Sequence, residues 1–135
     1  MLGANRRVRR AVETVTVQLW PVDEWMARLA VEPEAVSFVK VDTQGSEVGV
    51  LRGAAALLAR RHVAWQMEVD PALLKHAGVT VLELVALLST HFTHFIDLGT
   101  TTAGPRTRPT SELGDTLAYV GVEQSKTDLV VYNAE

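Results

Sequence analysis

The sequence predicts an α/β fold with a mostly parallel sheet, and three observations support that fold class. Residues 37–41 form a short apolar, β-rich run that is followed by a turn and by apolar residues at helical spacing. A second apolar run at residues 63–69 follows this helix, so the stretch reads as strand, helix and strand within about 30 residues. Further helix and strand patterns follow at residues 80–90 and 93–98. Because crossovers of this kind join parallel strands and are right-handed in nearly all proteins, we expect these strands to run in one direction.

The composition is that of an ordinary globular domain. The chain has 135 residues, of which 47% are hydrophobic, and a formal net charge of −3, so we expect one domain with a real core and no nucleic-acid partner. Apolar stretches are broken well short of about 18 residues, and the N-terminus lacks the apolar segment of a signal peptide. The absence of cysteine excludes disulfides, thiolate metal sites and a cysteine nucleophile. These features predict a cytoplasmic protein without a membrane partner.

The N-terminal region is expected to contribute an arm, a strand and a short helix. Four of the first ten residues are arginine, and residues 1–12 read either as a phosphate-binding patch or as a basic arm that stays in water. The domain itself is expected to span residues 13–135. Within it, residues 13–20 alternate apolar and polar side chains, which predicts a half-buried strand, and residues 23–30 predict a short helix.

The stretch after residue 36 carries the clearest local signals. Residues 37–41 show no polar alternation, which suits a strand covered on both faces, and Asp42 ends it. Gly45 supplies the backbone freedom of a tight turn, and Ser46 is placed to cap the next helix. Apolar residues then recur at helical spacing as far as Leu58.

Polar side chains gather where the predicted strands end. In open α/β sheets, ligands bind outside the carboxyl ends of the strands, which is where Asp42, Gln44 and Glu47 are expected to lie. Glu68 closes the next strand, so the right-handed crossover places it on the same rim as Asp42. Alternatively, Asp42 and Gln44 only satisfy backbone donors of the turn, and the residue pattern does not choose between the two interpretations.

The C-terminal half is predicted to hold one firm helix and one long loop. Thr80 and Glu83 have the spacing of a capping box at a helix start. Residues 99–115 form the longest irregular segment, which could fold over the rim as a lid, with Arg106 or Arg108 either holding an anionic substrate or simply exposed. Residues 127–133 predict a last strand. A weaker hypothesis pairs His91 with His94 on a metal.

Residues 40–54, KVDTQGSEVGVLRGA, resemble the signature of the FkbM-type methyltransferase family. That signature reads Lys, an aliphatic residue, Asp, any residue, Glu or Gln, Gly, any residue, Glu, and then a helix with Leu, Lys or Arg, Gly and Ala. Residues 17–26 resemble the family's upstream strand, which ends in Leu-Asp-Asp, and residues 63–69 resemble its next strand, which closes on Glu68. The resemblance covers about half of the chain, and its matched positions are Lys40, Asp42, Gln44, Gly45, Glu47, Leu51, Arg52, Gly53 and Ala54.

The resemblance implies S-adenosylmethionine-dependent methyl transfer, commonly to oxygen, on a Rossmann-like sheet of the class I methyltransferase type. Sheets of this type end in an antiparallel strand, which the resemblance implies for residues 127–133. The acceptor would be the hydroxyl of a small molecule or sugar. Asp42 and Glu68 are the catalytic candidates, with Asp42 as the base, and Asp42, Gln44, Gly45 and Glu47 would line the cofactor crevice. Gln44 stands where many relatives carry an acidic residue. No metal is expected, although a third hypothesis places a hard cation among Asp42, Glu47, Glu68 and Asp70.

The family's leading strands and their glycine-rich turn have no counterpart in the sequence, whose only early glycine is Gly3. The chain therefore resembles the carboxyl half of the catalytic domain, and the strand at residues 37–41 would lack a neighbour on one side. An unpaired edge of this kind is a template for association. We expect a homodimer, a complementing N-terminal polypeptide or aggregation, unless residues 13–20 cover the edge. The alternative function is a non-catalytic half-domain that acts as an interaction module.

Overall fold

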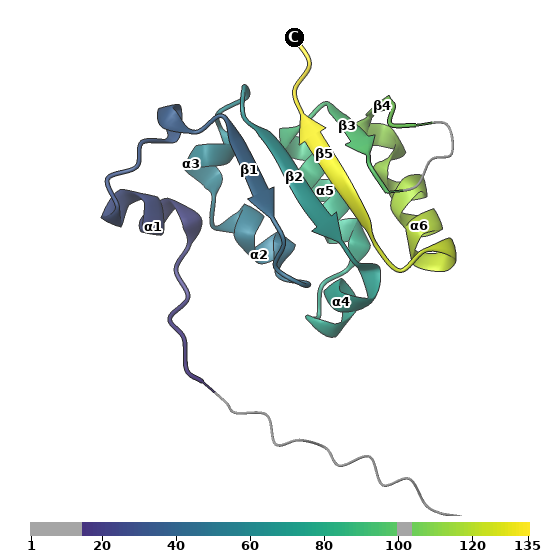
Figure 1. Ribbon diagram of the computed structural model, residues 1–135, viewed down its shortest axis with the longest axis horizontal. Helices are drawn as coiled ribbons and strands as arrows, with labels where there is room; N and C mark the ends of the chain where they lie inside the picture. Colours follow the sequence, from purple (N-terminus) through teal and green to yellow (C-terminus); the bar gives the residue numbers. More distant parts are fainter. Residues whose placement is uncertain (1–14, 100–103) are drawn as a thin grey trace, which may run out of the picture.

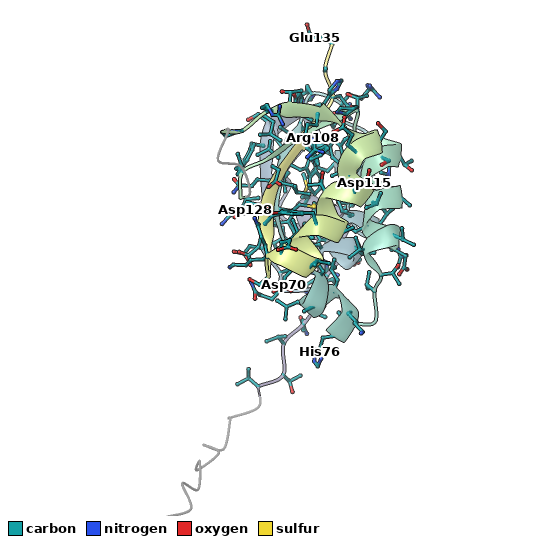
Figure 2. The ribbon with its side chains drawn as sticks, turned by 90° about the vertical axis from the view of Figure 1, so that its right-hand side faces the viewer. Asp70, His76, Arg108, Asp115, Asp128 and Glu135 are labelled. Carbon is teal, nitrogen blue, oxygen red and sulfur yellow. The ribbon has the colours of Figure 1, made fainter. Side chains whose placement is uncertain are left out.

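The computed structural model describes residues 15–99 and 104–135, which form a mixed α/β structure around one five-stranded sheet (Figure 1). Helices lie against one face of the sheet, and the turned view shows this as two layers (Figures 1 and 2). None of the helices in the described part of the chain combines the length and apolar character needed to cross a bilayer. In chain order, the elements are α1 (Val22–Arg28), η1 (Pro33–Ala35), β1 (Phe38–Val41), α2 (Glu47–Arg52), α3 (Ala55–Leu58), β2 (Ala64–Val69), α4 (Pro71–His76), α5 (Val81–His91), β3 (His94–Asp97), β4 (Thr107–Pro109), η2 (Thr110–Glu112), α6 (Leu113–Glu123) and β5 (Thr127–Tyr132).

The strands lie in the order β1-β2-β5-β3-β4, so the last strand of the chain sits in the middle of the sheet. β1 and β2 are parallel, whereas β5 is antiparallel to both β2 and β3, and β4 is antiparallel to β3. β1, β2 and β3 therefore point the same way, in line with the expected direction of these three strands. Because β5 separates β2 from β3, only one pairing among the described strands is parallel, which is fewer than a mostly parallel sheet would have.

The core lies between the sheet and the helix layer. Along β2, Trp65, Met67 and Val69 are buried, while the residues between them are only partly covered. β5 shows the same alternation. Trp65 packs edge-on against Phe92, with ring centroids 6.3 Å apart. The alternation follows from the period of two in a strand, which turns every second side chain toward the helices.

The predicted strand at residues 13–20 is wrong over its described part, residues 15–20, which have no regular secondary structure. Val15, Val17 and Leu19 are 71%, 69% and 89% exposed. An alternating pattern favours a strand only where a neighbouring strand is available, and no described strand pairs with this segment. Residues 13 and 14 and the basic arm at residues 1–12 lie outside the described residues.

The strand at residues 37–41 and the helix after it also differ from the prediction. β1 is the edge strand of the described sheet, and Phe38 is 50% exposed, so the strand is not covered on both faces. The helical run to Leu58 is split into α2 and α3. A Cβ at Gly53 would lie 3.2 Å from the Cα of Pro21, and the carboxylate of Asp23 accepts the backbone N–H of Ala56 at 2.9 Å. These contacts with Pro21, before α1, and with Asp23, in the first turn of α1, lie where α2 ends and α3 begins as a separate helix.

The segment at residues 99–115 is more ordered than its sequence suggested. It contains β4, η2 and the first residues of α6, and residues 100–103 lie outside the described part. Arg108 lies on β4, where its Nε donates to Glu112 at 2.7 Å and its guanidinium lies 5.3 Å from the ring of Phe95. Because Arg108 is engaged by these contacts, it is not a free anion-binding group.

Candidate active site at the carboxyl ends of the strands

The structure brings the two predicted catalytic carboxylates together through a glutamine. Asp42 follows β1, and Glu68 lies near the end of the neighbouring strand β2. The Nε2 atom of Gln44 donates to Asp42 Oδ1 at 3.0 Å and to Glu68 Oε1 at 2.9 Å. An amide nitrogen carries two hydrogens, so one side chain bridges both carboxylates. We call these three residues the carboxylate clamp.

The turn after β1 places Gln44 between its two partners. Gln44 has φ +55° and Gly45 has φ +108°, so two successive residues take positive φ values that residues other than glycine rarely adopt. A Cβ at Gly45 would lie 2.6 Å from the backbone oxygen of Leu73 on α4. Only glycine fits this close approach, which sets the turn against α4 and aims Gln44 along the rim.

Glu47 is turned into this turn and does not line the rim. Its side chain is 2% exposed, and its carboxylate accepts hydrogen bonds from Thr43 N at 3.2 Å, from Thr43 Oγ1 at 3.0 Å and from Gly45 N at 3.0 Å. Ser46, predicted as the cap, occupies the N-cap position but makes no side-chain cap hydrogen bond. The glutamate therefore satisfies the backbone donors of the turn that precedes α2, and it shapes the site from inside.

Lys126 completes the clamp and was not predicted from the sequence. It precedes β5, and its Nζ donates to Glu68 Oε2 at 2.7 Å. The hydrogen bond to Glu68, followed by the charges of Glu68, Asp42 and Asp128, raises the pKa of Lys126. Since β5 was expected to be antiparallel, a lysine just before it belongs at this rim, but nothing in the sequence pairs it with a residue 58 positions away. Lys126 balances part of the negative charge that the clamp concentrates.

A third carboxylate, Asp97, stands at the end of β3 with a structural role. It is buried and accepts from the Gly99 backbone N–H at 3.0 Å and from the Thr127 hydroxyl. The hydrogen bond from Thr127 fastens the end of β3 to the start of β5, and the one from Gly99 holds the turn that follows β3. Asp97 therefore stabilises the part of the rim that is formed by β3 and β5.

The hypothesis of a hard-cation site is not supported by the positions of its residues. Asp70 accepts from the backbone N–H groups of Ala72 and Leu73, which makes it the N-cap of α4, and Glu47 points into its own turn. In the separately suggested metal pair of His91 and His94, the ring of His94 stacks on Tyr132. Within residues 15–99 and 104–135, no three histidine or carboxylate side chains lie in an arrangement that could hold a metal ion.

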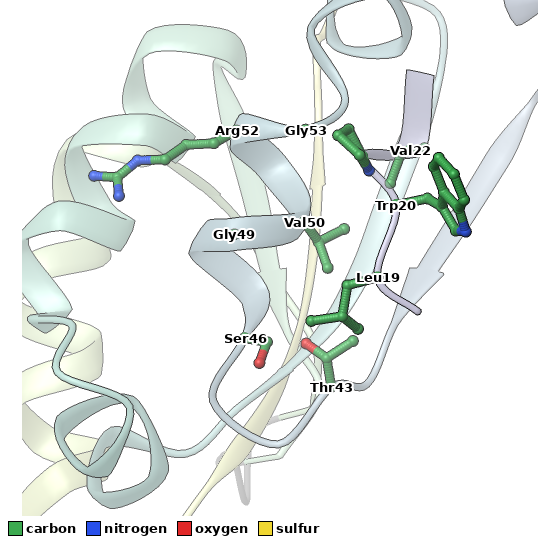
Figure 3. Close-up of a pocket in the computed structure, with 10 residues that line it drawn as sticks. Leu19, Trp20, Val22, Thr43, Ser46, Gly49, Val50, Arg52 and Gly53 are labelled. Carbon is green, nitrogen blue, oxygen red and sulfur yellow. The ribbon is translucent and has the colours of Figure 1, made fainter. Parts of the chain in front are cut away.

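A hollow of about 820 Å³ lies beside the clamp, between residues 19–22 and α2 (Figure 3). Leu19, Trp20 and Val50 supply apolar walls, and Thr43 also lines the hollow. Thr43 separates Asp42 from Gln44 in the chain, so the hollow and the clamp share one turn. The two together form a candidate binding region at the edge of the sheet.

An α/β sheet with polar side chains gathered at the carboxyl ends of its parallel strands defines a class of ligand-binding and catalytic domains. The family model of the FkbM methyltransferase domain matches residues 2–97 of this chain. The chain therefore belongs to the FkbM methyltransferase family, as its central motif predicted. The match contains Asp42, Gln44 and Glu68 and ends before Lys126. Among curated proteins, none matches the chain.

Proposed function

We propose that the chain is an S-adenosylmethionine-dependent methyltransferase domain that methylates a hydroxyl group of a small molecule or sugar. The observation that carries this proposal is the carboxylate clamp, which joins Asp42 and Glu68 through Gln44 inside the segment matched by the family model. The carboxylates of Asp42 and Glu68 suit this cofactor, because their negative charge attracts its positively charged sulfonium and amino groups. The strand order also supports a sheet that corresponds to the later strands of a class I methyltransferase, with β5 as the antiparallel strand.

In the proposed reaction, Asp42 is the general base. When bound, S-adenosylmethionine supplies a methyl group on positively charged sulfur. Asp42 would accept the proton that the acceptor hydroxyl releases as its oxygen takes the methyl group, with sulfur as the leaving group. Gln44 donates a hydrogen bond to Oδ1 of Asp42, and Oδ2 of Asp42 lies 3.8 Å from Lys40 Nζ. The Asp42 side chain remains partly exposed, so an incoming hydroxyl can reach it.

Glu68 has a different task, because both of its oxygens are engaged. Oε1 accepts from Gln44 and Oε2 accepts from Lys126, and the side chain is largely buried. Glu68 therefore positions Gln44 and adds negative charge near the proposed cofactor crevice. Gly45 contributes the turn that aims Gln44, and Glu47 stabilises that turn from inside.

The test is isothermal titration of the full chain with S-adenosylhomocysteine, followed by methyl-transfer assays with a panel of hydroxyl acceptors. We expect binding in the micromolar range. The absence of both heat and a thermal shift at millimolar ligand would overturn the proposal for this chain.

The role of Asp42 is tested by Asp42→Asn, which we expect to lower kcat by about 10²–10⁴-fold while leaving the thermal unfolding midpoint nearly unchanged. Asp115→Asn is the matched control, because Asp115 is an exposed aspartate on α6 (Figure 2). Full turnover by Asp42→Asn would remove Asp42 from the mechanism.

A further inference from the structure

The outer edge of β1 is open in the described part of the molecule. β1 pairs with β2 on one side and is the end strand of the sheet. On the other side, no backbone hydrogen bond joins Phe38–Val41 to any described residue outside β2. Phe38 is half exposed at this edge. Such an edge offers N–H and C=O groups to an additional strand.

The same molecule carries a segment with a strand pattern and no partner. Residues 15–20 alternate Val15, Val17 and Leu19 with polar or amphipathic residues, and these three apolar side chains are largely exposed. The segment leaves the domain from a fixed point, because the Arg28 guanidinium lies 3.7 Å from the ring of Trp20. We call residues 15–20 the exposed segment.

We propose that the exposed segment of one copy pairs with the β1 edge of a second copy, and that the exchange is reciprocal. Each copy carries both the donor segment and the acceptor edge, so a two-fold axis satisfies both pairings and closes the assembly as a dimer. Six residues in a strand span about 20 Å, which exceeds the length of the four-residue β1. This exchange is independent of the proposed methyl transfer.

The side-chain pattern of the exposed segment fits the two faces of the sheet. Val39 and Val41 of β1 lie on the face that packs against the helices, whereas Phe38 and Lys40 lie on the opposite face. A strand added beside β1 places its apolar residues on the helix side, in line with Val39 and Val41. Its polar residues, Thr16 and Gln18, then continue the face that faces water.

The area available is enough for a weak, specific dimer. Val15, Val17 and Leu19 are each more than two-thirds exposed and Phe38 is half exposed, so these four side chains supply the apolar surface available for burial. Two copies of this set, with the surfaces that they cover, reach the lower range of specific interfaces, about 1,000–1,200 Å². We therefore expect a dissociation constant in the micromolar range.

Sedimentation equilibrium of the full chain across low to high micromolar concentrations tests the exchange. Val17→Lys places a charge in the pairing segment and is expected to weaken dimerisation at least about tenfold. Val122→Lys is the matched control, because Val122 is similarly exposed on α6. A chain that stays monomeric throughout this range, or a dimer that Val17→Lys leaves unchanged, would overturn the proposal.

Cysteine cross-linking identifies the surfaces that meet, because the chain has no cysteine of its own. Copies with Gln18→Cys are mixed with copies carrying Phe38→Cys and oxidised, because residue 18 of the added strand and Phe38 lie on the same face of the sheet. We expect disulfide-linked heterodimers in excess over either homodimer. Preferential cross-linking of two Phe38→Cys copies would instead indicate edge-to-edge pairing of β1 and would refute the exchange. An internal disulfide formed by the double variant in monomers would show that the segment covers its own edge, which also refutes it.

Discussion

The turn that carries Gln44 is predicted to depend on Glu47 and not on Ser46. Glu47→Ala removes the acceptor of the Thr43 and Gly45 backbone N–H groups and of the Thr43 hydroxyl. An unsatisfied buried donor costs about 1–3 kcal/mol, and the hydroxyl can turn to water. The two backbone groups together give an expected loss of about 2–6 kcal/mol from the free energy of unfolding. A small domain has about 5–15 kcal/mol in total, so the loss is large.

Ser46→Ala is the matched comparison one residue away. Its side chain makes no cap hydrogen bond in the structure, so the free energy of unfolding should change by less than about 0.5 kcal/mol. The sequence pattern alone predicts the reverse, with a cost of about 1 kcal/mol for loss of a serine cap. Urea unfolding followed by tryptophan fluorescence measures both variants, because Trp65 is buried in the folded state and becomes exposed on unfolding. If Ser46→Ala proves the more damaging of the two, the assignment of the turn to Glu47 is wrong.

Three further predictions concern the rim and the helices around it. Gly45→Ala should destabilise the protein by more than about 2 kcal/mol, because the new Cβ would meet a backbone oxygen of α4. Gly78→Ala is also at positive φ but in open space, so it should cost about 1 kcal/mol. Equal losses of the two variants in urea unfolding would contradict this reasoning. Lys126→Met should lower stability below about pH 10.5. The difference in stability between the variant and the unaltered protein should disappear as the pH rises through the raised pKa of the lysine. A difference that persists at higher pH would show that the variant changes side-chain packing and not only charge. Glu83→Gln should lower stability at neutral pH, because hydrogen bonds from Thr80 lower the pKa of this carboxyl. The difference in stability between the variant and the unaltered protein should shrink below about pH 4.5, as the pH falls through the lowered pKa. A loss of stability that does not depend on pH would count against that cause.

Local and topological signals predicted the parts of the structure that depend on few partners. The capping box of Thr80 and Glu83 is present, with the Thr80 hydroxyl accepting from the Glu83 backbone N–H, because both residues lie within one helical turn. Asp42 and Glu68 share a rim because a parallel crossover leaves little choice of geometry. The order of strand, turn and helix at the centre could therefore be predicted from the sequence, although the helix is split into α2 and α3.

The failures depend on partners distant in the chain or on competition between neighbours. Residues 15–20 have the pattern of a strand, yet no described strand pairs with them. Lys126 reaches Glu68 across 58 positions, which no local pattern encodes. Helix α6 could have been found, because Leu113, Leu117 and Val120 recur at helical spacing and are buried together.

The central position of β5 has a consequence for the synthesis of the protein. β1 and β2 come early in the chain, β3 and β4 follow, and in the described sheet the two groups are joined only through β5. During translation the two halves of the sheet have no hydrogen bonds to each other until Thr127–Tyr132 emerges from the ribosome. The nascent chain must therefore keep two open strand edges apart, which favours engagement by chaperones before β5 inserts between them. A premature stop before residue 127 would leave the two halves unconnected.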